Sequence, residues 1–236
     1  MEFTGVEQII LRVKGKLPRL LFILSGPSGV GKNTIIKKLL ANHPDSVARV
    51  RTYTTRERRE GEVEGDQYYF VSHDEFRRLA REGHLMEADA DTVGHDVYGL
   101  GDLYSMPADP FEGVPEDTHL VIAEVDIHGM RRLKERYPQA IAIFVTAPPS
   151  VLVERIHGRL DDKMDADSLT QRMETAREQI QAASEFDYVI VNREGHLAEA
   201  VEAVERIIEV ERMRVREGVD LLSIMPDDEF NAAINS

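Results

Sequence analysis

The stretch LLFILSGPSGVGKNTIIKKLL, residues 20–40, decides the fold of this protein. It opens with a continuous apolar run at residues 20–25, as expected of a strand buried on both faces. A glycine-rich turn follows, and the next apolar residues recur at helical spacing: Ile35, Ile36, Leu39 and Leu40. Pro44 marks the end of this helix. The stretch therefore predicts a strand, a glycine-rich loop and a helix in direct succession.

Three further apolar runs predict strands of the same sheet, at residues 120–125, 140–145 and 188–191. Helical patterns separate several of these runs, at residues 127–137 and 168–183. Because strands alternate with helices, we predict the α/β fold class, with a doubly wound parallel sheet covered by helices on both faces.

Two stretches depart from this alternation and are predicted to be insertions into a core domain that spans residues 20–208. Residues 49–118 are polar and rich in arginine, glycine and tyrosine, and they contain the strand-like segment QYYFVS at 67–72. Residues 155–178 are highly charged and helical in pattern.

The two ends of the chain, residues 1–19 and 209–236, are predicted to be extensions of this core. Residues 197–216 predict one long helix. Its apolar face comprises Leu197, Val201, Val204 and Ile208. We expect this face to pack on the core. The alternative is that it binds a partner protein or forms a homodimer.

The composition excludes several classes of protein. A net charge of −14 argues against broad binding to nucleic acid. The absence of cysteine excludes disulfides and thiolate metal sites. No apolar run approaches the ~20 residues of a membrane span, and residues 1–20 lack the pattern of a signal peptide. We therefore expect a cytoplasmic protein that neither binds nucleic acid broadly nor crosses a membrane.

The glycine-rich turn predicts a phosphate-binding loop, because backbone N–H groups in such a turn and at the helix N-terminus point at bound phosphates. Glycines let the backbone approach the ligand, and Lys32 is expected to reach the β- and γ-phosphates. The predicted ATP-binding residues of the loop are Gly26, Pro27, Ser28, Gly29, Val30, Gly31, Lys32, Asn33 and Thr34.

Asn33 departs from the usual pattern G-x-x-x-x-G-K, which continues with a serine or threonine that offers its hydroxyl to Mg²⁺. An amide oxygen also ligates hard cations, but the asparagine side chain is longer and Mg²⁺ demands near-ideal geometry. Asn33 is therefore compatible with a tolerated variant, with slowed catalysis, or with a site that binds without turnover. Glu124 and Asp126 end a predicted strand on one face. We predict Asn33 and Glu124 as ligands of Mg²⁺, and Thr34 as a second phosphate contact.

The segment RVRTYTTRERR, residues 49–59, holds five arginines and one acid in an acidic chain. Planar guanidinium groups match phosphate oxygens, and Arg56 and Arg59 are the pair that we favour. A solvated charged loop is the alternative.

At this point the chain resembles the guanylate kinase family over residues 20–208. The resemblance rests on SGPSGVGKNT, TTRERREGEVEGDQYYFVSHDEF, VIAEVDIHG, APPSVLVERIHGR and FDYVIVN, in this order. It implies a P-loop kinase core with an inserted subdomain that binds the nucleoside monophosphate, about residues 49–118, and a helical lid, about residues 155–178.

The resemblance also implies site residues. Arg56, Arg59, Tyr68 and Tyr98 match residues that hold the phosphate of GMP. Thr52, Glu87 and Asp126 match residues that read guanine, whose N1–H and N2–H₂ donors suit carboxylate acceptors. Arg155, Arg159 and Arg172 match lid arginines that close on the ATP phosphates, and Asn192 matches an asparagine near adenine. The implied catalytic set is Lys32, Arg56, Arg155, Arg159 and Arg172, with Mg²⁺ and ATP as phosphoryl donor.

Several departures from the family pattern keep other functions open. Leu100 stands where the family usually has serine or threonine, and the segment 86–99 is longer than usual. Prolines 107, 110 and 115 forbid the continuous helix that the family normally has there. The favoured function is phosphorylation of GMP or dGMP by ATP. The alternatives are a kinase with another acceptor, such as another nucleoside monophosphate or ribose 1,5-bisphosphate, and a non-catalytic phosphopeptide-binding module.

Overall fold

The computed structural model describes residues 19–86, 88–89, 92–93, 101–157 and 166–214. Contacts divide the chain into two units. One unit is Arg19–Arg206, and the other combines Met1–Pro18 with Ile207–Ser236. The site described below lies in Arg19–Arg206.

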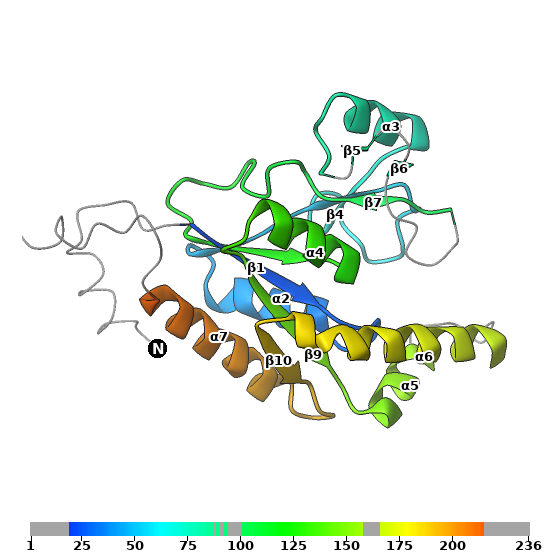
Figure 1. Ribbon diagram of the computed structural model, residues 1–236, viewed down its shortest axis with the longest axis vertical. Coiled ribbons are helices and arrows are strands. Elements are labelled where there is room, and N and C mark those ends of the chain that lie inside the picture. Colours follow the sequence, from blue (N-terminus) through cyan, green and yellow to red (C-terminus); the bar gives the residue numbers. More distant parts are fainter. Residues whose placement is uncertain (1–18, 87, 90–91, 94–100, 158–165, 215–236) are drawn as a thin grey trace, which may run out of the picture. The chain divides into compact units, whose positions relative to one another are not determined.

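A five-stranded sheet forms the centre of this unit, in the order β10-β9-β1-β8-β2 (Figure 1). The strands are β1 (Leu20–Ser25), β2 (Val47–Arg49), β8 (Leu120–Glu124), β9 (Ile141–Thr146) and β10 (Tyr188–Val191). Every neighbouring pair is parallel. The predicted α/β fold with a parallel sheet is confirmed, and the four predicted strands lie within one residue of their expected bounds.

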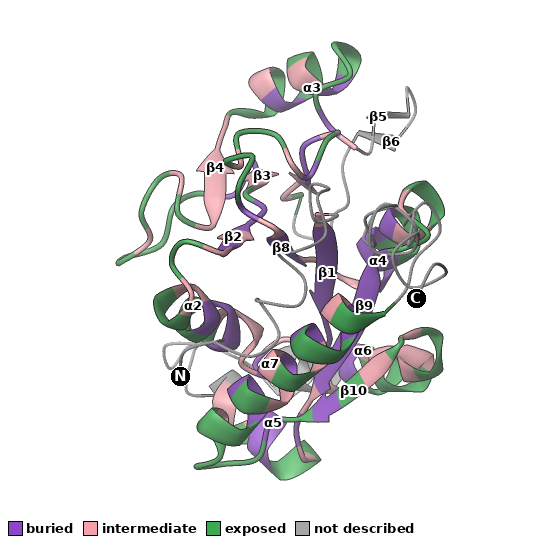
Figure 2. Ribbon diagram, turned by 90° about the vertical axis from the view of Figure 1, so that its left-hand side faces the viewer, coloured by how far each residue is buried: buried purple, intermediate pink, exposed green. Residues whose placement is uncertain are grey.

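Helices on both faces bury β1 along its whole length (Figure 2). Ile23 faces α4 (Ile127–Arg136) and shares an apolar cluster with its Met130. Side chains alternate along a strand, so Phe22 points to the opposite face. Figure 1 shows α2 (Lys32–Asn42) on that side of the sheet. Helix α2 ends two residues before Pro44, as the sequence predicts.

The edge strand β2 was not predicted, and it carries Arg49 into the core sheet. The polar insertion therefore leaves the sheet after Arg49 and returns at β8. It forms a second sheet in the order β4-β3-β7 and carries α3. Its elements are β3 (Thr52–Thr54), β4 (Tyr68–Phe70), α3 (His73–Arg81), β5 (Ala88–Asp89), β6 (Thr92–Val93) and β7 (Tyr104–Ser105). Strand β4 confirms the predicted strand-like segment.

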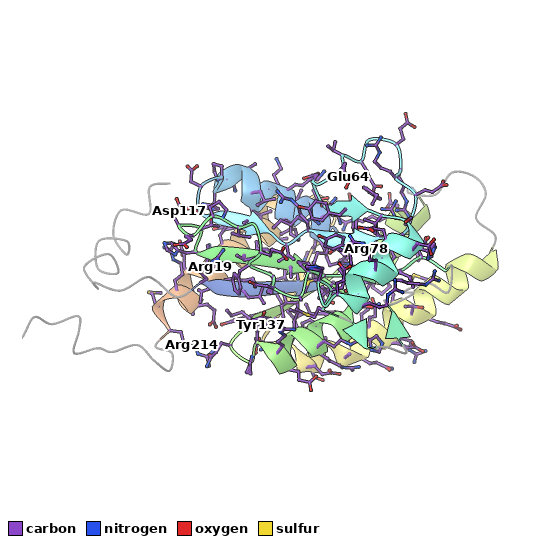
Figure 3. The ribbon with its side chains drawn as sticks, turned by 90° about the horizontal axis from the view of Figure 1, so that it is seen from above. Arg19, Glu64, Arg78, Asp117, Tyr137 and Arg214 are labelled. Carbon is purple, nitrogen blue, oxygen red and sulfur yellow. The ribbon has the colours of Figure 1, made fainter. Side chains whose placement is uncertain are left out.

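The proline-rich part of the insertion, residues 101–119, contains no helix. The sequence predicts this outcome, because a proline inside a helix removes a hydrogen bond and clashes with the preceding turn. Arg19, labelled in Figure 3, holds this segment by donating to the carbonyl of Val114 at 3.3 Å and by lying over the ring of Phe111.

Four helical segments complete the described part of the chain. They are α5 (Pro149–His157), α6 (Ala166–Gln181), the 3₁₀ turn η1 (Ala182–Glu185) and α7 (Leu197–Met213). The predicted helix at 168–183 spans α6 and the start of η1, and the last predicted helix ends at Met213. Val201 and Val204 of α7 are buried within the chain. Among the described residues, no helix is long and apolar enough to cross a membrane.

Candidate nucleotide-binding and phosphotransfer site

The glycine-rich loop connects β1 to α2 and packs too closely against its neighbours to carry side chains at two positions. Gly26 has a φ of 137°, and a Cβ there would overlap the carbonyl oxygen of Val145 on β9. Gly31 has a φ of 94°, and a Cβ there would lie 2.6 Å from Nδ2 of Asn192. Both conformations are unfavourable for residues other than glycine. The loop backbone is thus pressed onto the carboxyl end of the sheet, where α/β proteins bind their ligands.

Lys32 lies over this loop as the first residue of α2. Its Nζ donates hydrogen bonds to the carbonyl oxygens of Gly26 at 2.6 Å and Pro27 at 3.1 Å. The ammonium group is therefore held beside the backbone that is predicted to surround the phosphates.

Asn192 and Arg155 contact the outer side of the loop through the carbonyl of Val30. Asn192 donates from Nδ2 at 2.7 Å, and Arg155 donates from Nη1 at 3.4 Å and reaches Glu194 at 3.0 Å. The Oδ1 atom of Asn192 is buried and has no hydrogen-bond partner within the described residues. Buried acceptors are normally satisfied, so this atom is suited to a donor on a ligand, such as the amino group of adenine.

Asn33 and Glu124, the two predicted metal ligands, share one partner, Arg49. Arg49 donates from Nη1 to Oδ1 of Asn33 at 2.7 Å and from Nη2 to Oε2 of Glu124 at 2.5 Å. The Arg49 side chain is only 4% exposed and that of Glu124 is 18% exposed. A buried guanidinium therefore connects the start of α2 with the end of β8.

This arrangement does not fit a protein-bound Mg²⁺. The two oxygens that would ligate the ion already accept hydrogen bonds from a fixed cation, and a second cation beside it would be repelled. In the described part of the chain, no three histidine or acidic side chains form a group that could hold a metal. We therefore assign no step of the chemistry to an ion held by Asn33 and Glu124.

The predicted acceptor side of the site is centred on Arg56 in the insertion. Arg56 forms a two-point ion pair with Glu62, at 2.8 and 2.9 Å, and lies 5.4 Å from the ring centroid of Tyr68. Burial alone lowers the pKa of Arg56, but hydrogen bonds with Glu62 and Tyr104 outweigh burial and raise it. The guanidinium is thus permanently charged and held in one orientation.

Tyr68 keeps its proton, because burial and then the nearby charge of Glu124 raise its pKa well above the ordinary value. Its hydroxyl accepts from Nε2 of Gln67 at 2.9 Å, and the same Nε2 lies 3.3 Å from Oε2 of Glu124. A chain of contacts therefore runs from Asn33, at the end of the glycine-rich loop, to Tyr68 and Arg56, which are predicted to bind the acceptor.

Other predicted site residues lie around these two clusters. Thr52 begins β3, and Thr34 and Arg59 are exposed. The backbone N–H of Arg59 donates to Glu62 at 2.8 Å. Asp126 lies beyond the end of β8, and its Oδ1 caps α4 by accepting from the N–H of Gly129 at 2.8 Å.

Four predicted site residues cannot be placed in this geometry. Glu87, Tyr98 and Arg159 lie outside the described residues. Arg172 lies on α6, and its side chain is not described.

The sequence reading missed four residues of these clusters: Arg49, Glu62, Gln67 and Tyr104. Arg49 belongs to the arginine-rich segment, but its burial follows from β2, a strand too short for a periodic signal. Glu62 and Gln67 lie in the segment TTRERREGEVEGDQYYFVSHDEF, but the sequence pattern indicates no function for either residue. Tyr104 contacts Tyr68 edge-on, at 6.1 Å between ring centroids. This contact depends on the pairing of β7 with β3, in which Tyr104 lies opposite Thr54, 50 residues earlier in the chain.

A glycine-rich phosphate loop at the end of a parallel strand, connected to an arginine cluster on an insertion, defines a P-loop kinase. The sequence model of guanylate kinase matches residues 18–211 of this chain. The chain belongs to the guanylate kinase family.

Curated relatives and a solved structure agree with this assignment. A guanylate kinase of Nostoc sp. is 36% identical over 194 residues, which are 81% of this chain and 92% of the relative. A guanylate kinase of Lactococcus lactis is 35% identical over 211 residues, 89% of this chain and 96% of the relative. The crystal structure of guanylate kinase from Anaplasma phagocytophilum covers 92% of this chain and 97% of its own, with a TM-score of 0.65 and 24% identity. At this level of sequence identity, the similarity to the crystal structure shows that the fold is shared.

Proposed function

We propose that this protein transfers the γ-phosphoryl group of ATP to GMP or dGMP, forming ADP and the nucleoside diphosphate. The observation that carries the proposal is the line of contacts from the phosphate loop at Asn33, through Arg49, Glu124 and Gln67, to Tyr68. It supports the proposal because it connects the predicted ATP-binding loop with a residue predicted to bind the acceptor, within one unit. Family membership identifies the reaction.

The reaction needs positioning and charge more than proton chemistry. A phosphate oxygen of the acceptor attacks the γ-phosphorus, and the bond from that phosphorus to the β–γ bridging oxygen breaks, so that ADP leaves with the electron pair. The acceptor phosphate is already anionic, so no general base is needed. Lys32 stabilises the transferred group, Arg56, Arg59 and Tyr68 hold the acceptor phosphate, and Mg²⁺ arrives bound to ATP as part of the substrate.

The remaining assignments follow the family pattern. Thr52, Glu87 and Asp126 bind guanine, Tyr98 binds the acceptor phosphate, and Asn192 binds adenine. Arg155, Arg159 and Arg172 belong to a lid at about residues 155–178 that closes on ATP. The catalytic domain comprises residues 20–208, flanked by two extensions. We expect a cytoplasmic enzyme, and a dimer through α7 stays a prediction.

The test is ADP formation from ATP and Mg²⁺ with one acceptor at a time: GMP, dGMP, AMP, UMP, CMP and ribose 1,5-bisphosphate. We expect turnover with GMP and dGMP alone. Turnover with ribose 1,5-bisphosphate instead would assign a different acceptor. No turnover with any acceptor, while ATP still binds, would favour a binding module.

A further inference from the structure

We propose that Arg49 is a built-in cation of the phosphate site, which Asn33 and Glu124 hold beside the phosphate loop to balance the charge of the bound triphosphate. Asn33 is then an anchor for Arg49 and not a ligand for a metal ion. This inference rests on the proposed function, in that it takes the loop to bind a nucleoside triphosphate.

The position of Arg49 follows from the sheet. Arg49 is the last residue of β2 and pairs in parallel register with Ile122 of β8. Because the carboxyl ends of parallel strands meet at one edge, Arg49 reaches the edge where the phosphate loop leaves β1. Its two terminal nitrogens are fixed by acceptors on different elements, α2 and β8. A planar guanidinium held at two points has little freedom to move.

The buried Arg49 gives a physical reason for the unusual asparagine at position 33, which accepts a hydrogen bond from it. The amide oxygen of Asn33 lies 2.7 Å from Nη1 of Arg49. A serine hydroxyl at position 33 is attached one atom closer to the backbone and would leave this buried donor without its acceptor, which is unfavourable. Asn33 therefore fits a site that contains Arg49.

The charges of Arg49, Glu124 and ATP indicate what this arrangement does. Glu124 balances Arg49 in the unliganded site, and the positive charge lies next to the residue that follows Lys32. ATP without a metal carries a larger negative charge than ATP with Mg²⁺, and so it interacts more strongly with a fixed cation. Arg49 thus supports ATP binding most when Mg²⁺ is absent, and it disfavours a second cation at Glu124.

The test measures the Kd of ATP by calorimetry, once with EDTA and once with saturating Mg²⁺, for the wild type and Arg49→Met. We expect the substitution to weaken binding of metal-free ATP about tenfold more than binding of the Mg²⁺ complex. The matched control is Arg51→Met, which removes an exposed arginine bonded to Tyr69 instead, at 3.2 Å. The control should change both Kd values less than about twofold.

If Arg49 had a purely structural function, Arg49→Met would weaken the binding of both forms of ATP equally, and that result would overturn the proposal. An unchanged Kd in both conditions would overturn it as well. Arg49→Met leaves Glu124 without its buried partner and can unfold the protein. The double variant Arg49→Met/Glu124→Gln removes both charges together. It should still lose affinity for metal-free ATP selectively, but by less than Arg49→Met, because the negative charge of Glu124 is removed as well.

A second measurement tests the anchor. Asn33→Ser should weaken the binding of metal-free ATP severalfold in the wild-type background. It should have no effect in the Arg49→Met background, because the Arg49 guanidinium that Asn33 anchors is then absent. Equal effects of Asn33→Ser in both backgrounds contradict the coupling. Binding and turnover separate the two proposals: a wild type that binds ATP but phosphorylates no GMP contradicts the proposed function alone. An active wild type whose Arg49→Met variant shows no selective loss contradicts only the assignment of Arg49.

Discussion

The Glu62 carboxylate accepts hydrogen bonds from both terminal nitrogens of Arg56, at 2.8 and 2.9 Å. It also accepts from the backbone N–H of Arg59, at 2.8 Å. One carboxylate therefore holds the side chain of Arg56 and the backbone of Arg59, the two arginines that are predicted to bind the acceptor phosphate. The ring of Phe70 lies 5.5 Å from the Arg56 guanidinium and restrains it from another side.

Glu62→Gln should raise the KM for GMP about tenfold with a smaller change in the KM for ATP, because the amide cannot accept at both of its terminal atoms. Steady-state kinetics with each substrate varied in turn measure the effect. Glu60→Gln, at an exposed neighbouring position, is the control and should behave as the wild type. An unchanged KM for GMP in Glu62→Gln would mean that Arg56 needs no such support.

The same pair predicts a pH dependence of stability. Burial alone raises the pKa of Glu62, but hydrogen bonds from Arg56 and the backbone of Arg59 outweigh it and lower the pKa below 4.5. The folded state therefore binds a proton less readily than the unfolded state, so the pair stabilises the fold above about pH 4.5 and loses this effect as the pH falls further. Urea unfolding at pH 6 and pH 4 should show a larger loss for the wild type than for Glu62→Gln.

Lys32→Met should lower kcat at least about a hundredfold, because the ammonium stabilises charge on the transferred phosphoryl group. Coupled measurement of ADP formation gives the rate, and thermal unfolding confirms that the variant is folded. Lys38→Met removes an exposed lysine from the same helix and should leave kcat unchanged. Wild-type rates in Lys32→Met would remove this lysine from the phosphate site.

Gly31→Ala should destabilise the protein and abolish ATP binding, because the added Cβ meets both a positive φ and Nδ2 of Asn192 at 2.6 Å. Gly83→Ala is the matched control, since Gly83 has a φ of 77° and open space around it. Strain alone should cost the control about 1 kcal/mol of unfolding free energy. Urea unfolding should show a larger loss for Gly31→Ala, and equal losses would mean that Asn192 does not press on the loop.

Arg59→Ala should lower kcat/KM for GMP more than tenfold, as expected for loss of a charged contact to phosphate. The neighbouring Arg58 is also exposed, so Arg58→Ala tests whether loss of any positive charge on this loop has the same effect. We expect kcat/KM of Arg58→Ala to stay within about twofold of the wild type. Similar losses in both variants would indicate general electrostatic attraction of GMP instead of a specific contact by Arg59.

The sequence by itself determined the strand, loop and helix at residues 20–40 and the parallel sheet around them. These features depend on local signals: an apolar run that only a doubly covered strand tolerates, glycines where the backbone turns, and prolines where a helix must end. The same local chemistry correctly predicted that residues 101–119 form no continuous helix. Arg56 and Arg59 were predicted to bind the acceptor phosphate because their segment is basic in an acidic chain.

Only the tertiary structure decided the partner of Asn33. From the sequence alone, the amide oxygen of Asn33 lies beside a phosphate loop, and this position indicates a metal ligand. Its actual neighbour, Arg49, arrives through the pairing of the short strand β2 with β8, and Glu124 completes the group from 75 residues further along the chain. Periodicity and turn chemistry act over a few residues, whereas the partner of a buried polar group depends on which strands lie side by side. That arrangement is set by the packing of the whole sheet.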